Sequence, residues 1–290
     1  MVGLLAKGHI LLEGVPGLGK TLPVKSLSHA LGVSFKRIQF TPDLLPSDVT
    51  GTTIFDPNSN RFFFRPGPIF ANIVLADEIN RATPKTQSAL LEAMQEQSVT
   101  VGGRVHRLES PFMVLATQNP IEMEGTYPLP EAQVDRFFFK LLLRYPTRAE
   151  LARIADLTTA SPSSPLREVL DGEAVLRVRN WIREVPIAEA VKDFTVRLVL
   201  STHPQGENST PMAQKYIQYG SSPRGLQSLI LAAKARALLS GRPNVSFDDI
   251  RAVTMPSLRH RIILNLEADA SGVSTETVLA EALERVPEVV

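Results

Sequence analysis

The chain contains no cysteine among its 290 residues, which excludes disulfides, thiol nucleophiles and cysteine-based zinc sites. We expect a reducing, cytoplasmic environment from this absence. No apolar run approaches about 20 residues, the length that a membrane-spanning helix needs, and the N-terminus lacks a signal-peptide pattern. An excess of one charge is also missing, because 31 Lys and Arg residues balance 30 Asp and Glu residues. This balance disfavours a protein that binds nucleic acid over its whole surface.

The composition that is present, 43% hydrophobic and 21% charged, is typical of an ordered globular protein. Short apolar runs with strand character lie at 10–12, 35–40, 73–76, 112–116 and 137–143. Most of these runs are continuous, as in strands that are buried on both faces of a parallel sheet. Helical stretches at 20–31 and 84–97 separate some of them, and hairpins are expected at 50–66 and 98–108. The first part of the chain is therefore predicted to be an α/β domain.

Helical periodicity replaces this pattern after Pro146. Thr147 and Glu150 form a capping-box pattern, and Ser246 with Asp249 marks a later helix start. The stretch 159–170 is rich in Ser and Pro and is predicted to be a loop. We therefore expect an α/β domain at 1–146 and a small all-α domain at 147–290.

The segment Gly14-Val-Pro-Gly-Leu-Gly-Lys-Thr21 matches the phosphate-binding pattern G-x-x-x-x-G-K-[ST]. It follows a strand-like run and precedes a helix-like one, which is the context that the pattern requires. Backbone N–H groups of such a loop surround phosphate oxygens, Lys20 reaches the β- and γ-phosphates, and the Thr21 hydroxyl binds Mg²⁺. The residues expected to bind the nucleotide are Gly14, Val15, Pro16, Gly17, Leu18, Gly19, Lys20, Thr21 and Leu22.

Polar residues follow two of the expected buried strands. Asp77 and Glu78 end the run 73–78, and Asn119 follows the run 112–116. Open α/β sheets bind ligands at the carboxyl ends of their strands. Asp77 is predicted to hold Mg²⁺ through water, Glu78 to polarise the attacking water, and Asn119 to orient that water near the γ-phosphate.

Two arginines are candidates for stabilising a γ-phosphate. Arg136, in Pro130-Glu-Ala-Gln-Val-Asp-Arg136, fits an arginine finger that acts in cis or from another subunit, and the alternative is a surface ion pair with Asp135. Arg224 follows a helix start at Ser222 and Pro223, where a cation is unfavourable unless an anion lies nearby. For the remaining cationic cluster, Arg259-His-Arg261, a solvated helix face is favoured over contact with a polyanion. The run Phe62–Phe64 either grips a partner or packs its hairpin onto the domain.

Together these elements resemble the MoxR family of AAA+ ATPases. The matching segments begin at Gly8-His-Ile-Leu-Leu-Glu-Gly-Val-Pro-Gly-Leu-Gly-Lys-Thr21 and continue with Ala76-Asp-Glu-Ile-Asn-Arg-Ala82, Lys85–Met94, Ala116-Thr-Gln-Asn-Pro120 and Gly125–Phe137. The resemblance covers about residues 8–265.

The resemblance implies roles that spacing alone does not show. Asn119 falls at the sensor-1 position, Arg136 at the arginine-finger position that acts on the next subunit, and Arg224 at the sensor-2 position of the helical lid. The two hairpins correspond to the helix-2 insert and the pre-sensor-1 insert. The resemblance further implies ATP and Mg²⁺ as ligands, a hexameric ring, and a chaperone-like role toward proteins that carry von Willebrand factor A domains.

Two alternatives to protein remodelling stay open from the sequence. Relatives with both inserts include motors that move along nucleic acid, which the balanced charge disfavours. Only nine residues precede Ile10, where the family has a further stretch that contributes to the adenine pocket. We therefore expect either a shortened start or impaired nucleotide binding, and in the latter case a nucleotide-free scaffold.

Overall fold

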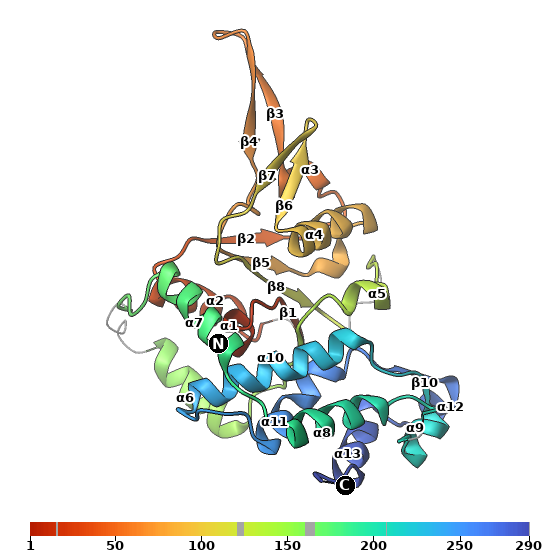
Figure 1. Ribbon diagram of the computed structural model, residues 1–290. Coiled ribbons are helices and arrows are strands. Elements are labelled where there is room, and N and C mark those ends of the chain that lie inside the picture. The colour runs from red at the N-terminus through yellow and green to blue at the C-terminus, as the bar shows by residue number, and fades with distance from the viewer. Residues whose placement is uncertain (16, 121–124, 160–165, 207, 290) are drawn as a thin grey trace. The chain divides into compact units, whose positions relative to one another are not determined.

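The computed structural model describes residues 1–15, 17–120, 125–159, 166–206 and 208–289 (Figure 1). The chain forms two compact units. We call the first the sheet unit, which consists of Leu11–Pro128 and Leu141–Val175, and the second the helical unit, which consists of Met1–Ile10, Leu129–Lys140 and Leu176–Val290. The units are defined by proximity in space, so the chain enters each of them more than once. The expected boundary between 146 and 147 divides the chain at one position, and it stays a prediction.

A five-stranded sheet contains all the apolar runs that the sequence marks as strands. Its order is β2-β5-β8-β1-β9, and the pairs β2–β5 and β5–β8 are parallel. The strands are β1 (Ile10–Glu13), β2 (Phe35–Gln39), β5 (Ile73–Asp77), β8 (Met113–Gln118) and β9 (Phe139–Leu142). In β5 the first four residues are buried, and in β8 the first five are. This burial on both faces explains the continuous apolar runs and confirms the α/β fold class.

The strand order places the ends of β1, β5 and β8 next to one another. After β1 the chain crosses to β2 at the far edge, so the order of connection reverses beside β1. A reversal of this kind opens a crevice at the carboxyl ends of the strands, where ligands bind in open α/β sheets. Lys20 and Asn119 lie in the loops after β1 and β8, and Asp77 is the last residue of β5.

Helices lie between the strands of the sheet unit and after the last of them. They are α2 (Thr21–Ala30), α3 (Pro46–Thr50), the 3₁₀ turn η1 (Ile79–Arg81), α4 (Pro84–Glu96) and α6 (Arg148–Thr159). Pro23 lies at the third position of α2, where a backbone N–H has no intrahelical partner, so the proline is tolerated. The Thr147 capping box is formed, because the Thr147 amide and hydroxyl each lie 2.8 Å from the Glu150 carboxylate.

Two hairpins extend from one side of the sheet unit (Figure 1). They are β3–β4 (Gly51–Asp56 and Arg61–Pro66) and β6–β7 (Ser98–Val101 and Arg104–Arg107). For the run Phe62–Phe64, the packing interpretation holds at Phe64, and contact with a partner stays a prediction. Phe64 stacks on His106 at 3.8 Å between ring centroids and joins the two hairpins, whereas Phe62 and Phe63 are exposed.

The helical unit is built almost entirely from helices, as the periodicity predicts. Among the described residues, no helix is both long and apolar enough to cross a membrane. The elements are α1 (Val2–Leu5), α5 (Glu131–Val134), most of α7 (Gly172–Glu184), α8 (Glu189–Leu200), α9 (Pro211–Tyr216), β10 (Ile217–Tyr219), α10 (Pro223–Leu239), α11 (Phe247–Leu258), β11 (Ile263–Leu264), α12 (Leu266–Ala270) and α13 (Thr275–Arg285).

Candidate active site

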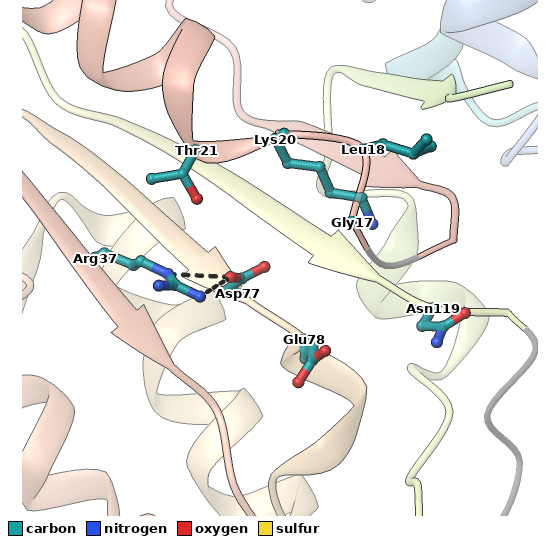
Figure 2. A pocket seen from close by; sticks show the side chains of 9 residues that line it. Gly17, Leu18, Lys20, Thr21, Arg37, Asp77, Glu78 and Asn119 are labelled. Carbon is teal, nitrogen blue, oxygen red and sulfur yellow. Dashed lines mark hydrogen bonds and ion pairs between the residues drawn. The ribbon is translucent and has the colours of Figure 1, made fainter. Parts of the chain in front are cut away.

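A pocket of about 250 Å³ lies at the carboxyl end of the sheet (Figure 2). Residues from four separate loops and strands line it. They are Gly17, Leu18, Gly19, Lys20, Thr21, Arg37, Asp77, Glu78 and Asn119. The structure therefore gathers the loop before α2, the two acids at the end of β5 and the asparagine after β8 into one cavity, as the sequence predicts.

The loop between β1 and α2 bends through two glycines with positive φ, Gly17 at 82° and Gly19 at 68°. L side chains disfavour this region, so these positions favour glycine. Among the described residues, no acceptor is found for the amide groups of Gly17, Leu18, Gly19 and Lys20. Free amides beside a helix N-terminus attract anions, so this cradle fits phosphate oxygens.

The remaining loop residues lie around this cradle. Gly14 is buried, and its amide donates to the carbonyl of Gln118 at 3.3 Å. Val15 is half-buried, while the Leu22 side chain is 69% exposed and does not line the pocket. Pro16 lies outside the described residues. Contact with a nucleotide through Leu22 is therefore expected from its backbone.

Lys20 stands at the start of α2 with its ammonium group folded back onto the loop. Its Nζ donates to the carbonyl of Gly14 at 2.6 Å. Partial burial lowers the pKa of Lys20, although Asp77 and Glu78 act in the opposite direction. A phosphate in the cradle supplies a stronger acceptor than a carbonyl, because both partners then carry charge.

Asp77 ends β5 with both carboxylate oxygens engaged. Oδ1 accepts from the Thr117 hydroxyl at 2.6 Å, and Oδ2 accepts from the guanidinium of Arg37 at 2.5 and 3.0 Å (Figure 2). Arg37 lies on the neighbouring strand β2. These contacts fix the orientation of the carboxylate at the pocket wall.

Glu78 adopts a left-handed backbone conformation, with φ 56° and ψ 50°. This region is costly for a residue with a Cβ, and strain of this kind concentrates at functional sites. The Glu78 amide donates to the Thr117 hydroxyl at 2.9 Å. Its carboxylate accepts from Gln39 Nε2 at 2.8 Å and from Arg81 Nη1 at 3.2 Å.

Three of these partners were missed by the sequence analysis: Arg37, Gln39 and Thr117. Arg37 and Gln39 are alternate residues of β2, and Arg37 Nη2 also donates to Gln39 Oε1 at 2.7 Å. The one feature of the sequence that could have marked them as site residues is a pair of polar side chains at alternate positions near the end of an expected strand. That pattern is equally typical of a solvent-facing edge strand, so it did not single them out.

Asn119 is buried and lies in the pocket with Glu78 (Figure 2). Its carbonyl accepts from Asn80 Nδ2 at 3.3 Å, which ties the loop after β8 to the turn η1. Glu78 and Asn119 thus face one cavity from the ends of neighbouring strands.

The donor set fits a magnesium ion in chemical type. Mg²⁺ prefers oxygen ligands, a few of them from protein and the rest from water and phosphate. The hydroxyl of Thr21 and the carboxylate of Asp77 both belong to residues that line the pocket. The guanidinium of Arg37 opposes a cation at this place, because it already neutralises Asp77.

The two candidate arginines lie in the helical unit. Arg136 follows α5 and is exposed. Arg224 stands in the first turn of α10, 3.5 Å from the carboxylate of Asp135, and is half exposed. Asp135 is thus the anion that its helix position calls for. Ser222 is the N-cap residue, as expected, but its hydroxyl donates to Asp135 at 3.1 Å instead of capping the helix.

The prediction that Arg259-His-Arg261 is a solvated helix face is wrong. The side chain of Arg261 is only 2% exposed, and that of Arg259 is 15% exposed and pairs with Glu276 at 3.3 Å. Arg261 pairs with Asp135 at 2.9 Å. Neighbouring cations look solvated in a sequence because their partners, here Asp135 and backbone carbonyls, lie far away in the chain.

Comparisons with known proteins agree with this geometry. The profile of the ATPase family associated with various cellular activities (AAA) matches residues 9–139, and that of the AAA lid domain matches residues 210–282. The chain is 48% identical over 289 residues to the uncharacterized protein YeaC of Bacillus subtilis, which covers 99% of this chain and 87% of the relative. It is 44% identical over 286 residues to a protein named chaperone MoxR1 of Mycobacterium tuberculosis, with 99% and 76% covered. A crystal structure of a candidate ATPase from Cytophaga hutchinsonii superposes with a TM-score of 0.92 at 44% identity, covering 99% of this chain and 87% of that one.

Proposed function

Because the chain belongs to the MoxR family of AAA+ ATPases, we propose that it hydrolyses ATP with Mg²⁺ and uses the energy to remodel a protein partner. The observation that carries the proposal is the single pocket that unites the amide cradle, Lys20, Asp77, Glu78 and Asn119. Phosphoryl transfer needs positioning and charge stabilisation more than covalent chemistry. A cavity with free amides on one wall and carboxylates on another is suited to both needs.

Each residue of the pocket has a distinct part in this proposal. The amides of the loop and the ammonium of Lys20 hold the β- and γ-phosphates in place. Bound Mg²⁺ would neutralise charge on the phosphate oxygens, and Thr21 and Asp77 would hold it. Glu78 polarises the attacking water, and Asn119 holds that water in line with the γ-phosphate.

A further part of the proposal is that Arg136 acts on the nucleotide of a neighbouring subunit in a homo-oligomeric ring, with a hexamer expected. The Arg136 side chain is exposed and, among the described residues, makes no hydrogen bond or ion pair. An arginine that is offered to another molecule has these properties. Arg224 is proposed to act on the nucleotide of its own subunit.

The partner is proposed to be a protein. A relative named chaperone supports this choice, and so do the exposed Phe62 and Phe63 on the β3–β4 hairpin, because exposed apolar side chains at a projecting tip favour contact with apolar segments. A protein that carries a von Willebrand factor A domain is the first client to test.

The test is ATP hydrolysis measured against protein concentration, with and without Mg²⁺. Specific activity should rise with concentration, because one arginine comes from a neighbour. Arg136→Ala should lower kcat about a thousandfold or more, and Glu78→Gln should abolish turnover while ATP still binds. Arg285→Ala is the matched control, since Arg285 is exposed and pairs with Glu281 within α13.

Two outcomes would contradict the proposal. Full activity in Glu78→Gln would remove the assigned water-polarising residue. Silence of the wild-type protein at every concentration, combined with absence of ATP binding, would favour the scaffold alternative.

A further inference from the structure

Arg261 is a buried guanidinium whose donors are all in use. Nε donates to Asp135 Oδ1 at 2.9 Å, and Nη2 donates to the carbonyls of Asp135 at 3.1 Å and Phe137 at 2.7 Å. Nη1 donates to the carbonyl of Phe138 at 3.3 Å and to that of Ser257. Arginine has five N–H donors, and four of these five bonds reach the segment 135–138.

His260 adds a second hold on the same segment. Its Nε2 lies 2.9 Å from the carbonyl of Phe137. Burial lowers the pKa of His260 to about 3, with the neighbouring Arg261 acting in the same direction. The ring is therefore neutral near pH 7, and its Nε2 carries the proton, because a carbonyl only accepts.

The carboxylate of Asp135 contacts three residues at two places of the helical unit. Beside Arg261 it accepts from the Ser222 hydroxyl at 3.1 and 3.3 Å, and it lies 3.5 Å from Arg224 Nη1. Ser222 and Arg224 flank the start of α10, while Arg261 follows α11. The residue before Arg136 is thus bound to two helices of the unit.

Arg136 itself contrasts with its neighbours on both sides. Its amide donates to the carbonyl of Gln133 at 3.2 Å, so its backbone is held. Its side chain is exposed, and no partner for the guanidinium is found in the described part of the chain. A firmly bound backbone with one projecting cation is the arrangement that positions a catalytic group at low cost in entropy.

We propose that Asp135 and Arg261 are positioning residues that fix the backbone of Arg136 to the helical unit and thereby set where its guanidinium meets the neighbouring subunit. The inference rests on the proposed role of Arg136. It adds that loss of Asp135 impairs ATP hydrolysis at the site of the neighbouring subunit. Asp135 also contacts Arg224, which is proposed to act within its own subunit.

The first measurement is steady-state ATP hydrolysis by Asp135→Asn, which keeps the shape of the side chain and removes its charge. We expect kcat to fall about tenfold to a hundredfold, because small misplacement of a catalytic group costs this much. The KM for ATP should stay within about twofold of the wild type. Asp193→Asn is the matched control, since it breaks the ion pair that the exposed Asp193 forms with Arg197 in the same unit, and it should change neither constant.

Mixing subunits then identifies the site that is damaged. Glu78→Gln subunits cannot turn over ATP but carry an intact Arg136 segment. Asp135→Asn subunits mixed with them should recover activity above that of either protein alone, because the Asp135→Asn sites receive a well-placed arginine from their neighbours. Arg136→Ala mixed with Glu78→Gln is the reference and should recover in the same way.

The outcomes separate this inference from the proposed function. Recovery in the reference mixture without recovery in the Asp135→Asn mixture would overturn the inference alone and assign Asp135 to its own subunit through Arg224. Unchanged kcat in Asp135→Asn would overturn it as well. Failure of the reference mixture would overturn the trans-acting arginine and the inference together.

A second variant keeps the inference testable if Asp135→Asn does not fold. Arg261→Lys preserves the charge but replaces five donors in a planar fork by three on one nitrogen. The same fall in kcat, the same constant KM and the same recovery on mixing are expected. Arg251→Lys is its control, because Arg251 is a partly exposed arginine that bonds the carbonyl of Leu283 away from the segment 135–138.

Discussion

Arg37 places a positive charge directly on the carboxylate that is proposed to hold magnesium. Its guanidinium bonds Asp77 Oδ2 and Gln39 Oε1, and Gln39 in turn bonds Glu78. The two acids of the pocket are therefore linked through β2. Any cation that approaches Asp77 must compete with Arg37 or share the carboxylate with it.

We predict that Arg37→Gln lowers the Mg²⁺ concentration needed for half-maximal ATP hydrolysis by about two- to fivefold, the range for a half-exposed ion pair. A magnesium titration of the ATPase rate measures it. Arg107→Gln is the control, because Arg107 is exposed and has no ion pair among the described residues. A higher magnesium requirement in Arg37→Gln would show that Arg37 orients Asp77 for the metal instead of competing with it.

Among single residues, the sequence predicts the site residues that belong to long motifs, but it does not predict the residues that form hydrogen bonds with them. Lys20, Asp77, Glu78 and Asn119 stand in recognisable segments and meet in the pocket. Arg37, Gln39 and Arg261 depend on which strand or carbonyl lies beside them, and a single sequence does not contain that information. Burial of Arg261 was predicted wrongly for this reason.

The N-terminus of helix α11 is stabilised by the hydrogen bonds of one buried carboxylate. Asp249 accepts from the amide and hydroxyl of Ser246, both at 3.0 Å, and from both terminal nitrogens of Arg242. Burial alone would raise the pKa of Asp249, but the bonds from Arg242 and Ser246 outweigh it, and the pKa lies below its ordinary value of 3.8.

We predict that Asp249→Asn lowers the free energy of unfolding by about 1.5–3 kcal/mol near pH 7, the range for hydrogen bonds to a charged group. A carboxylate with a lowered pKa stabilises the fold above its unfolded pKa, and this contribution is lost as the pH falls through the folded pKa. The difference between the two proteins should therefore shrink below about pH 3.9. Urea denaturation at several pH values measures it.

The control for this prediction is Asp248→Asn. Asp248 lies in the same first turn of α11 but is exposed, so its change should stay within about 0.5 kcal/mol. Equal losses in both variants would show that helix polarity, and not the buried bonds of Asp249, stabilises the element.

Elements with local signals were predictable, and this helix is one of them. The Ser246–Asp249 capping box, the Ser222–Pro223 start and the Gly102–Gly103 turn all lie where the sequence predicts them. The sequence leaves open whether the run Phe62–Phe64 packs against the domain or contacts a partner. The outcome depends on a second hairpin that supplies His106, and contacts between separate hairpins leave no short-range pattern.

At the scale of the molecule, charge bears on the choice between a protein and a nucleic acid as partner. The net charge is +1, yet four exposed arginines lie on the hairpins, at Arg61, Arg65, Arg104 and Arg107. If all four bound phosphates of duplex DNA, the logarithm of affinity would fall with the logarithm of salt with a slope of about −3 to −4.

We predict that neither single-stranded nor duplex DNA stimulates ATP hydrolysis at about 150 mM salt, where so few contacts bind weakly. The ATPase rate with and without DNA measures it. Stimulation that the double variant Arg61→Glu, Arg65→Glu abolishes would revive the nucleic-acid motor.

The grouping of segments into units was beyond the sequence. The segment Leu129–Lys140 belongs with helices that lie far later in the chain, because its carbonyls and Asp135 are bound by Arg261, Ser222 and His260. A prediction that divides the chain at one position cannot assign a segment before that position to the unit formed by the residues after it.

The left-handed backbone of Glu78 has a consequence for selection. Glycine would relieve a cost of about 1–2 kcal/mol at this position, so the residue that the fold prefers differs from the residue proposed for chemistry. A library of variants at position 78 sorted for thermal resistance should enrich glycine, whereas one sorted for turnover should retain glutamate. A position where selection for stability and selection for turnover favour different residues is constrained by activity and not by folding alone.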